Sequence, residues 1–353
     1  MSIIKGKKEV AGLPQEDLEH ILDKAAPCFE KLRGKRLFIT GGTGFFGSWL
    51  LESFAWANDR LKLNSSAVVL TRNPEGIKKT NPHLYNYPAI DFLRGDIKSF
   101  KFPKGRFEYI IHAAVENNYG PNFFEMFENN IAGTRRILEF ARLCKNESFL
   151  FTSSGAVYGE QPAKLTHISE DYRGAPEMMK DFSAYGECKR VSEFYCSAYA
   201  KKFGINTRIA RCFAFMGPGL PLDAGFAVGN FIRDALKGGP IEVKSNKTVY
   251  RSYLYAADLT IWLMRILVDG EICRPYNVGS SESITILGLA EKVAQAFDPE
   301  PEIVIQSKID RPEGAVARYV PDTYLAEKEL KLKQWISLKE GIRRMADFYS
   351  KGG

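Results

Sequence analysis

Tyr185 and Lys189 stand four positions apart at the start of a long helical pattern, and together they could move a proton. Side chains at i and i+4 lie on one face of a helix. A free tyrosine has a pKa of about 10, so it is a poor base near neutral pH. A neighbouring ammonium favours the phenolate and lowers that pKa. The pair therefore fits a general base, although tyrosine and lysine at this spacing also occur by chance as two surface residues.

Ser154 belongs to a second segment that could take part in chemistry, TSSGAVYG, which follows an apolar strand pattern at 148–151. A serine hydroxyl both donates and accepts hydrogen bonds. At the end of a strand beside the Tyr185 helix, it could bond the same substrate oxygen as the tyrosine. A glycine-rich turn earlier in the chain strengthens the interpretation of these two segments as parts of one active site.

The glycine-rich turn lies in the stretch 37–47, LFITGGTGFFG. A short apolar run typical of a buried parallel strand ends at Thr40, and helical periodicity follows the turn. Gly41, Gly44 and Gly47 could allow a tight turn, the approach of a diphosphate to backbone N–H groups, and close packing of helix on strand. The diphosphate would lie at the helix N-terminus, where the helix dipole favours negative charge. An ordinary glycine-rich β–α turn is the alternative.

A second apolar strand pattern, 67–70, ends at Thr71 and Arg72. A dinucleotide fold usually carries an Asp or Glu at this place, bound to the adenosine ribose. With that carboxylate absent and an arginine present, a 2′-phosphate could be accommodated, which favours NADP over NAD. Arg72 could equally be a solvated loop residue, and an arginine can stack on adenine in either cofactor. NAD therefore stays open beside NADP.

Two further strand patterns end in residues that suit a flat cofactor. The third leads to Asp96 and Ile97, where the carboxylate could accept a hydrogen bond from the adenine amino group. The fourth ends in Ala113 and Ala114, whose small side chains leave room for a cofactor across the strand ends. His112, beside them, is interpreted as a packing and hydrogen-bonding residue rather than a catalytic one.

Strands alternate with helical patterns through the first half of the chain, which indicates a parallel sheet with helices on both faces. We therefore expect an α/β protein, with a Rossmann-type doubly wound parallel sheet and a smaller C-terminal α/β substrate domain. The expected domains are an N-terminal helical extension at 1–33, a dinucleotide-binding domain at 34–212, and a mainly nucleotide-sugar-binding domain at 213–350. Part of 250–280 is expected to return to the dinucleotide-binding domain.

The two ends of the chain carry simpler patterns. Apolar residues at helical spacing predict an amphipathic helix in the N-terminal extension, packed on the main body. In the C-terminal third, 226–236 and 258–268 have helical patterns. Residues 241–243 and 250–255 are expected to pair as strands around Asn246.

Length and composition bound what the chain can be. Its 353 residues suffice for one large α/β domain or two domains with ample core. Six scattered cysteines and four histidines lack metal-type spacing, so no metal site is expected. The net charge of +7 is spread along the chain, which suits an anionic small molecule and does not indicate nucleic acid. Without a long apolar run or a signal-peptide pattern, a cytoplasmic protein with no membrane contact is expected.

A series of motifs occurs in a fixed order along the chain. They are GGTGFFG, GDI, HAA, NIAGT, SSGAVYG and YGECK, then ARCFAFMGP at 210–218, Asn230, YRSY at 250–253, Asp258, YNVGS at 276–280 and Arg311-Pro312. Together they resemble the extended short-chain dehydrogenase/reductases that act on nucleotide sugars, the group named NAD-dependent epimerase/dehydratase. The resemblance implies a Rossmann domain, a small C-terminal domain that closes over a nucleoside-diphosphate sugar, and a homodimer formed through two helices of each subunit.

Matched position by position, the resemblance implies a role for each site residue. Tyr185 falls on the catalytic base, Lys189 on the lysine that binds the nicotinamide ribose, and Ser154 on the residue that contacts the reacting sugar hydroxyl. Substrate-diphosphate contacts fall on Asn230, Arg251 and Arg311. Bidentate arginine suits phosphate, although Arg311 could instead form a surface ion pair. The expected cofactor-binding residues are Gly41, Thr43, Gly44, Phe45, Phe46, Gly47, Thr71, Arg72, Asp96, Ile97, Ala113, Ala114, Asn130 and Lys189.

Three departures from the family pattern bear on the reaction. Gly155 and Ala156 stand where the 4,6-dehydratases carry Asp-Glu, and Ala156 also replaces the Glu of the glucuronate decarboxylases. Neither residue can transfer a proton, which disfavours dehydration and that form of decarboxylation. Ala214 replaces an asparagine commonly used on the substrate phosphates. The third departure is the missing carboxylate after the second strand.

These residues favour a nucleotide-sugar epimerase that acts at C4 through a transient 4-keto sugar. That chemistry needs only Tyr185, Lys189, Ser154 and a retained cofactor. The alternative is an NADPH-dependent reductase of 4-keto sugar nucleotides, which would use the same residues in one direction. A non-catalytic nucleotide-binding protein is disfavoured by the intact set of three side chains.

Overall fold

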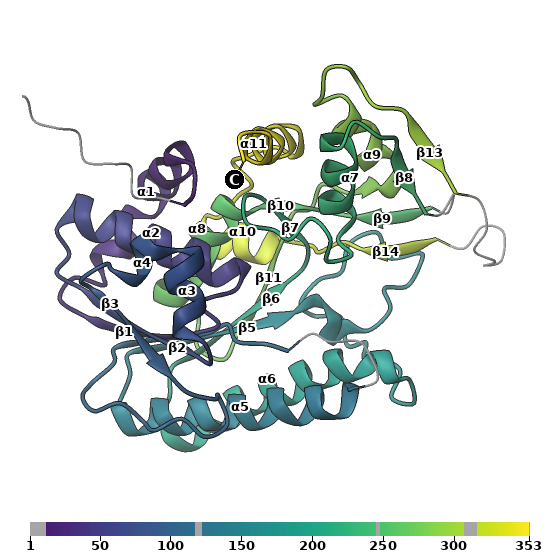
Figure 1. The fold of residues 1–353 in the computed structure, drawn as a ribbon. Helices are drawn as coiled ribbons and strands as arrows, with labels where there is room; N and C mark the ends of the chain where they lie inside the picture. The colour runs from purple at the N-terminus through teal and green to yellow at the C-terminus, as the bar shows by residue number, and fades with distance from the viewer. Residues whose placement is uncertain (1–11, 117–121, 245–247, 307–315, 353) are drawn as a thin grey trace, which may run out of the picture.

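The computed structural model describes residues 12–116, 122–244, 248–306 and 316–352. A seven-stranded sheet runs through its centre, as Figure 1 shows. The strands are β1 (Arg36–Thr40), β2 (Ser66–Thr71), β3 (Ile90–Arg94), β4 (Tyr109–His112), β5 (Ser148–Ser154), β6 (Thr207–Cys212) and β11 (Pro275–Val278). They are ordered β11-β6-β5-β4-β1-β2-β3, and every neighbouring pair is parallel. The order reverses between β1 and β4, which is where doubly wound folds bind ligands.

Helices cover both faces of the sheet, which confirms the expected Rossmann-type fold. On one face lie α5 (Phe123–Cys144) and α6 (Ala184–Phe203), which run side by side below the sheet in Figure 1. On the other lie α2 (Phe45–Leu61) and α8 (Ala256–Asp269). Alternate residues of β1 enter two separate cores, since Phe38 packs under α5 while Leu37 and Ile39 pack with the opposite layer. This two-sided burial is why the strand reads as a continuous apolar run.

Short elements join and extend this frame. Between β2 and β3 lie α3 (Pro74–Thr80) and α4 (Pro82–Tyr85). Two 3₁₀ turns, η1 (Gly155–Tyr158) and η2 (Asp181–Ser183), frame the segment between β5 and α6. The strand β11 pairs with β6 and forms one edge of the sheet, so residues 275–278 complete the sheet that the first six strands begin.

A smaller lobe lies at the carboxyl ends of the strands, at upper right in Figure 1. Its elements are β7 (Phe215–Met216), α7 (Ala227–Leu236), β8 (Ile241–Val243), β9 (Val249–Arg251), β10 (Leu254–Tyr255), β12 (Ile284–Thr285), α9 (Ile286–Ala294), β13 (Ile303–Ile305) and β14 (Ala317–Tyr319). The expected pairing of 241–243 with 250–255 is wrong. Instead, β8 pairs with β13, and β9 pairs with β12 and β14, because distant segments supply the partners. The expected turn at Asn246 lies outside the described residues.

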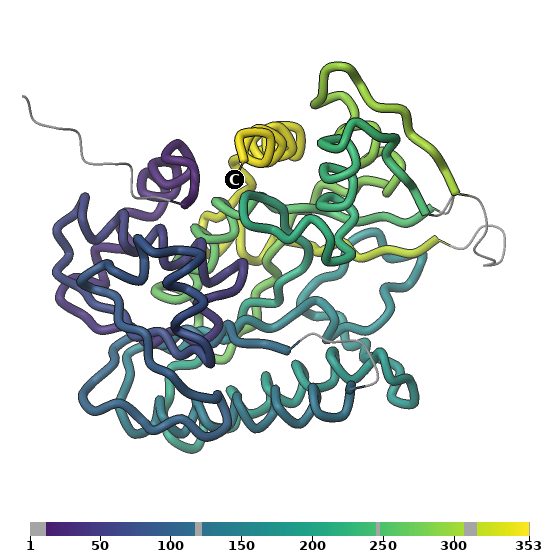
Figure 2. Tube along the Cα trace, viewed as in Figure 1, coloured from purple at the N-terminus to yellow at the C-terminus, as the bar shows by residue number. Residues whose placement is uncertain are grey.

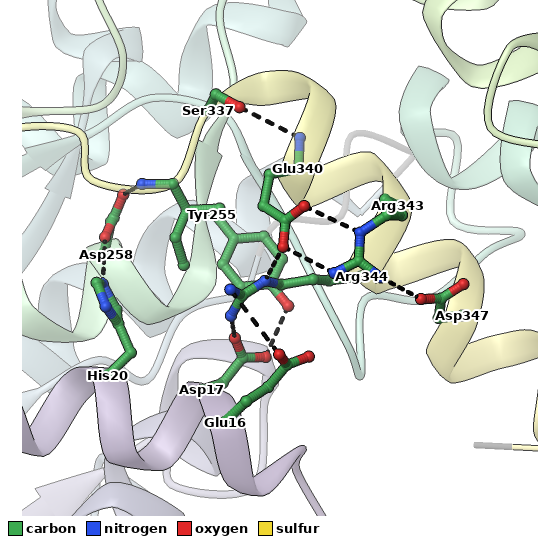
Figure 3. A network of polar contacts seen from close by, with 11 residues as sticks. Glu16, Asp17, His20, Tyr255, Asp258, Ser337, Glu340, Arg343, Arg344 and Asp347 are labelled. Carbon is green, nitrogen blue, oxygen red and sulfur yellow. Dashed lines mark hydrogen bonds and ion pairs between the residues drawn. The ribbon is translucent and has the colours of Figure 1, made fainter.

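The N-terminal extension forms the expected helix, α1 (Gln15–Glu30), which packs on α8 and α2 through Leu18, Ile21 and Phe29. Figure 2 shows it on the same side of the sheet as α11 (Leu338–Ser350), which follows α10 (Tyr324–Leu330) near the other end of the chain. Buried polar contacts join these parts in Figure 3. Within the described residues, no helix is long and apolar enough to span a membrane.

Candidate functional site

The glycine turn after β1 leaves no room for side chains at three of its positions, Gly41, Gly42 and Gly47. Gly41 has a φ of +74°, and a Cβ there would lie 2.5 Å from the backbone carbon of Ala113. A Cβ on Gly47 would lie 2.2 Å from the carbonyl oxygen of Gly41. Gly41 therefore allows both the turn and contact with the β4 loop, and Gly47 lets α2 begin against the turn.

The N-terminus of α2 is open and suited to an anion. Gly44 is its N-cap, no described side chain caps it, and its first turn carries no acidic residue. Thr43 and Gly44 are exposed, and a Cβ placed on Gly44 has one described neighbour within 4 Å, the Gly41 carbonyl oxygen at 3.6 Å. Phe45 and Phe46 follow, and the Phe46 ring packs edge-on against Phe215. Backbone N–H groups and the helix dipole at such an end favour a phosphate. The turn thus fits a dinucleotide diphosphate.

The ends of β2 and β3 carry the residues expected around adenosine. The Thr71 hydroxyl accepts a hydrogen bond from the Asn73 N–H at 3.2 Å. Arg72 is exposed and pairs with Glu116, its Nη1 lying 3.1 Å from the carboxylate Oε1. After β3, the Asp96 carboxylate accepts from the Lys98 N–H at 2.9 Å. Ile97 packs against Gly133 of α5, where a Cβ would lie 2.9 Å from the isoleucine side chain.

The loop after β4 is held by side chains from its neighbours. The Thr40 hydroxyl accepts from the Ala114 N–H at 3.1 Å, and Ala113 N–H donates to the Thr40 carbonyl oxygen. Asn130 on α5 accepts from the Glu116 N–H at 3.2 Å and donates to the Glu116 carbonyl oxygen at 2.9 Å. In this structure Asn130 therefore shapes the loop, and its direct contact with a cofactor stays a prediction.

Lys189 joins the helix α6 to the end of β5. Its Nζ donates to the Thr152 carbonyl oxygen at 2.7 Å and lies 5.9 Å from the centroid of the Tyr185 ring. Burial lowers the pKa of the Lys189 ammonium from its ordinary value. The start of α6 also abuts η1, because a Cβ on Gly186 would lie 2.5 Å from the Ala156 carbonyl oxygen. The expected tyrosine–lysine face therefore lies against the strand that carries Ser154.

Ser154 is buried at the last position of β5, and its hydroxyl accepts from the Ala156 N–H at 3.1 Å. The adjoining Gly155 faces aromatic side chains from the smaller lobe. A Cβ there would lie 2.8 Å from both the Phe213 ring and the Tyr319 hydroxyl. A larger residue would have to displace one of these groups, so the site is shaped around a glycine.

His112 has the structural role that the sequence indicates. Its ring nitrogens lie 2.8 Å from the Thr40 hydroxyl and 3.1 Å from the Thr134 hydroxyl. Burial, reinforced by the nearby Lys189 charge, lowers the pKa of His112 to about 3. The imidazole is therefore neutral near pH 7, where it holds β1, β4 and α5 together.

An ion pair beside β5 was missed by the sequence interpretation. Arg211 of β6 binds both oxygens of Glu193, at 3.0 and 2.7 Å, and Glu193 accepts from the Ser153 hydroxyl at 2.6 Å. Arg211 also donates to the Tyr158 hydroxyl at 2.9 Å. Glu193 continues the helical face of Tyr185 and Lys189 by one more step of four residues, and that spacing was the available signal.

The residues expected to hold the substrate diphosphate lie in the smaller lobe. Asn230 is on α7, where its side chain accepts from Arg233 at 3.4 Å. Arg251 is on β9, half-buried, with its guanidinium carbon 5.9 Å from the centroid of the Tyr319 ring. The Tyr319 hydroxyl also lies beside Gly155. Arg251 and the end of β5 therefore border the same aromatic side chain. Arg311 lies outside the described residues.

A parallel doubly wound sheet, an open glycine turn at its switch point and a tyrosine–lysine helix against β5 define the class as extended short-chain dehydrogenase/reductases. The model of the NAD-dependent epimerase/dehydratase family matches residues 37–279. The chain belongs to this family and is an enzyme of that type. UDP-glucuronic acid decarboxylase 6 of Arabidopsis thaliana is 31% identical to it over 317 residues, which cover 88% of each chain.

Solved structures share the fold at lower identity. UDP-glucuronic acid 4-epimerase of Bacillus cereus, in complex with a fluorinated UDP-glucuronic acid and NAD, superposes with a TM-score of 0.76 at 23% identity and covers 90% of this chain and 99% of its own. UDP-N-acetylglucosamine 4-epimerase of Methanobrevibacter ruminantium has a TM-score of 0.77 at 18% identity, covering 91% and 100%.

Proposed function

We propose that this enzyme is a nucleotide-sugar epimerase that inverts C4 and retains a nicotinamide cofactor. The observation that carries the proposal is the composition of the site at the end of β5. Ser154, Tyr185 and Lys189 are present there, and Gly155 and Ala156 supply no acid or base. Transient oxidation and reduction at one carbon needs the three side chains alone, whereas elimination needs further proton-transfer groups.

The chain's own residues would divide the work as follows. Tyr185 removes the proton of the sugar 4-hydroxyl and returns it, and Ser154 hydrogen-bonds the same oxygen. Lys189 supplies positive charge beside the phenolate, which favours ionised tyrosine. A bound nicotinamide would supply the hydride acceptor and donor for C4. Inversion then requires the keto sugar to turn before hydride returns, so the diphosphate contacts proposed for Asn230, Arg251 and Arg311 must hold one end while the sugar rotates.

Relatives named as decarboxylases raise a second candidate. The resemblance implies that those enzymes use a glutamate at the position of Ala156, and this chain has a methyl group there. The adjoining position, Gly155, is closed by Phe213 and the Tyr319 hydroxyl. These observations favour epimerisation over decarboxylation and over 4,6-dehydration.

Two long helices support the further proposal of a homodimer. On the face of the sheet away from α1 and α8, α5 and α6 pack side by side. Leu143 on α5 and Phe194 on α6 are 57% and 70% exposed. Large apolar side chains exposed on adjoining helices fit a contact with a second copy, and sedimentation velocity gives the oligomeric state directly.

The central experiment follows a deuterium label. Purified enzyme is first denatured, and the released cofactor and sugar nucleotides are identified by mass spectrometry. UDP-sugars deuterated at C4 are then supplied as a panel. An epimerase returns the label to C4 of the product with no net change in cofactor. The reductase is tested separately with unlabelled 4-keto nucleotide sugars, on which it would consume NADPH in proportion to product. Release of carbon dioxide would instead support the hypothesis of a decarboxylase.

Tyr185→Phe tests the assignment of the base. We expect kcat to fall by at least about 100-fold, the usual contribution of a positioned acid–base group. Tyr195→Phe, on the same helix, is the matched control and should keep full activity. Full activity in Tyr185→Phe would overturn the catalytic assignment.

A further inference from the structure

We infer that Glu116 makes this enzyme select NAD over NADP by neutralising Arg72 at the end of β2. The inference rests on the proposed cofactor site and reverses the preference that Thr71 and Arg72 indicated in the sequence. There, an arginine without a carboxylate favoured a 2′-phosphate. The structure places a carboxylate beside that arginine, supplied by the loop after a different strand.

The pair Arg72–Glu116 bridges the ends of two strands beside the glycine turn. Arg72 follows β2 and Glu116 lies in the loop after β4, and β1 lies between these strands in the sheet. The 3.1 Å contact therefore connects the two strands that flank β1, at the sheet edge where β1 opens into the glycine turn. In a dinucleotide fold, the end of β2 is where the adenosine ribose is recognised.

Glu116 is held in place by its neighbours on α5. Its Oε2 accepts from Asn129 at 2.8 Å, while its backbone N–H and carbonyl oxygen both bond the Asn130 side chain. Asn129 is itself fixed, since its Oδ1 accepts from Lys98 at 2.7 Å. An exposed ion pair contributes little to stability, but this carboxylate is oriented whether or not Arg72 contacts it.

The fixed carboxylate changes what Arg72 can offer a cofactor. A phosphate monoester carries about −1.5 to −2 charges at pH 7, so a 2′-phosphate bound by Arg72 would lie close to the Glu116 carboxylate. The repulsion offsets the attraction of the arginine, because both act over comparable distances. The 2′-hydroxyl of NAD is neutral and meets no such opposition. The net result is discrimination against NADP.

The test measures cofactor binding without turnover. Dissociation constants for NAD and NADP are determined by isothermal titration calorimetry for the intact chain, stripped of nucleotide, and for Glu116→Gln, Arg72→Ala and the double variant. Adenosine 2′-monophosphate and adenosine 5′-monophosphate serve as fragment probes. Glu128→Gln, an exposed acid on α5, controls for the loss of one negative charge.

We expect the unaltered enzyme to bind NAD more tightly than NADP. Glu116→Gln should tighten NADP by about tenfold, or roughly 1.4 kcal/mol, and change NAD by less than about threefold. Adding Arg72→Ala should cancel that gain, and Glu128→Gln should leave the ratio unchanged. The inference is overturned if NADP is preferred initially, or if Glu116→Gln leaves the ratio unchanged. Failure of both cofactors to bind would instead refute the proposed function.

Discussion

The Nζ atom of Lys189 donates a hydrogen bond to the Thr152 carbonyl oxygen at 2.7 Å, in a region closed to solvent. Thr152 is on β5 two residues before Ser154, so one buried side chain ties the helix of Tyr185 to the strand of Ser154. A buried ammonium costs free energy unless it is well bonded. Its retention here fits a site in which the charge is needed by the adjoining phenol.

Lys189→Met tests that need through the pH dependence of the reaction. Without the ammonium, the phenolate of Tyr185 loses a stabilising charge. We expect kcat to fall by about 100-fold at pH 7 and to recover partly as the pH rises, because the tyrosine then ionises unaided. A pH–rate profile from pH 6 to 10 measures both effects, with the exposed Lys202→Met as the control on the same helix. A uniform loss at every pH would show that Lys189 acts only as a structural or ribose-binding group.

The glycine turn gives a prediction that separates binding from folding. Gly44 has φ −90° and ψ −178°, which any residue adopts, and a Cβ there meets only the Gly41 oxygen among described atoms within 4 Å. Gly44→Ala should change the free energy of unfolding by less than about 1 kcal/mol. It should nevertheless weaken NAD binding by at least about tenfold, because the methyl group occupies space that the diphosphate approaches.

Gly47→Ala is the contrasting variant. Its Cβ would lie 2.2 Å from the Gly41 oxygen, so the helix or the turn must move. We expect a lower melting temperature together with lost binding. Denaturant unfolding and calorimetric titration on both variants check the pair of outcomes. Unchanged NAD affinity in Gly44→Ala would contradict a diphosphate at this turn.

The sequence was sufficient to predict the turn and the helix that form the site. It was insufficient to predict which charged side chains pair there. Gly41, Tyr185 and Lys189 could be placed because local spacing fixes which face of a turn or helix they occupy. Glu116 could not, since its contact with Arg72 depends on strand order in the sheet. The mistaken pairing of 241–243 with 250–255 has the same cause, since β8 and β9 pair with strands beyond residue 280 and β10 pairs with β7. Local patterns carry no information about such distant partners.

His112 predicts how stability depends on pH. Its pKa falls from about 6.5 in an unfolded chain to about 3 in the native fold. Between these values the unfolded state binds a proton that the native state does not, so the free energy of unfolding falls as the pH falls. One such group contributes about 1.4 kcal/mol per pH unit, or roughly 2 kcal/mol between pH 6.5 and pH 5.

Denaturant unfolding at pH 7 and pH 5 measures this loss, and His112→Gln should show a smaller one. The NMR chemical shifts of the imidazole rings report the protonation state of His112 directly, with His167 as internal reference. The His112 ring should keep its neutral signature at pH 5. A protonated His112 in the unaltered protein at pH 5 would contradict the prediction, and this measurement does not depend on the folding of His112→Gln.

The last prediction concerns Asp17, which joins the N-terminal helix to the C-terminal one. Its fully buried carboxylate contacts Arg344 Nη1 at 2.6 Å and the Tyr255 hydroxyl at 2.7 Å, as Figure 3 shows. Glu16, the neighbouring acid, is 56% exposed and lies 3.9 Å from the same arginine. Removing one member of a buried ion pair leaves the other charge buried without its partner, which lowers stability, whereas an exposed ion pair contributes little to stability.

Asp17→Asn should therefore lower the free energy of unfolding by about 2–4 kcal/mol, and Glu16→Gln by less than about 0.5 kcal/mol. Arg344 keeps its contact with Glu340 at 2.7 Å, which places the expected cost of Asp17→Asn below that of a fully isolated guanidinium. Urea unfolding of both variants measures the difference. Equal effects would mean that α1 is held by apolar packing through Leu18 and Phe29 alone, and that the buried carboxylate adds no net stability because its desolvation cancels its hydrogen bonds.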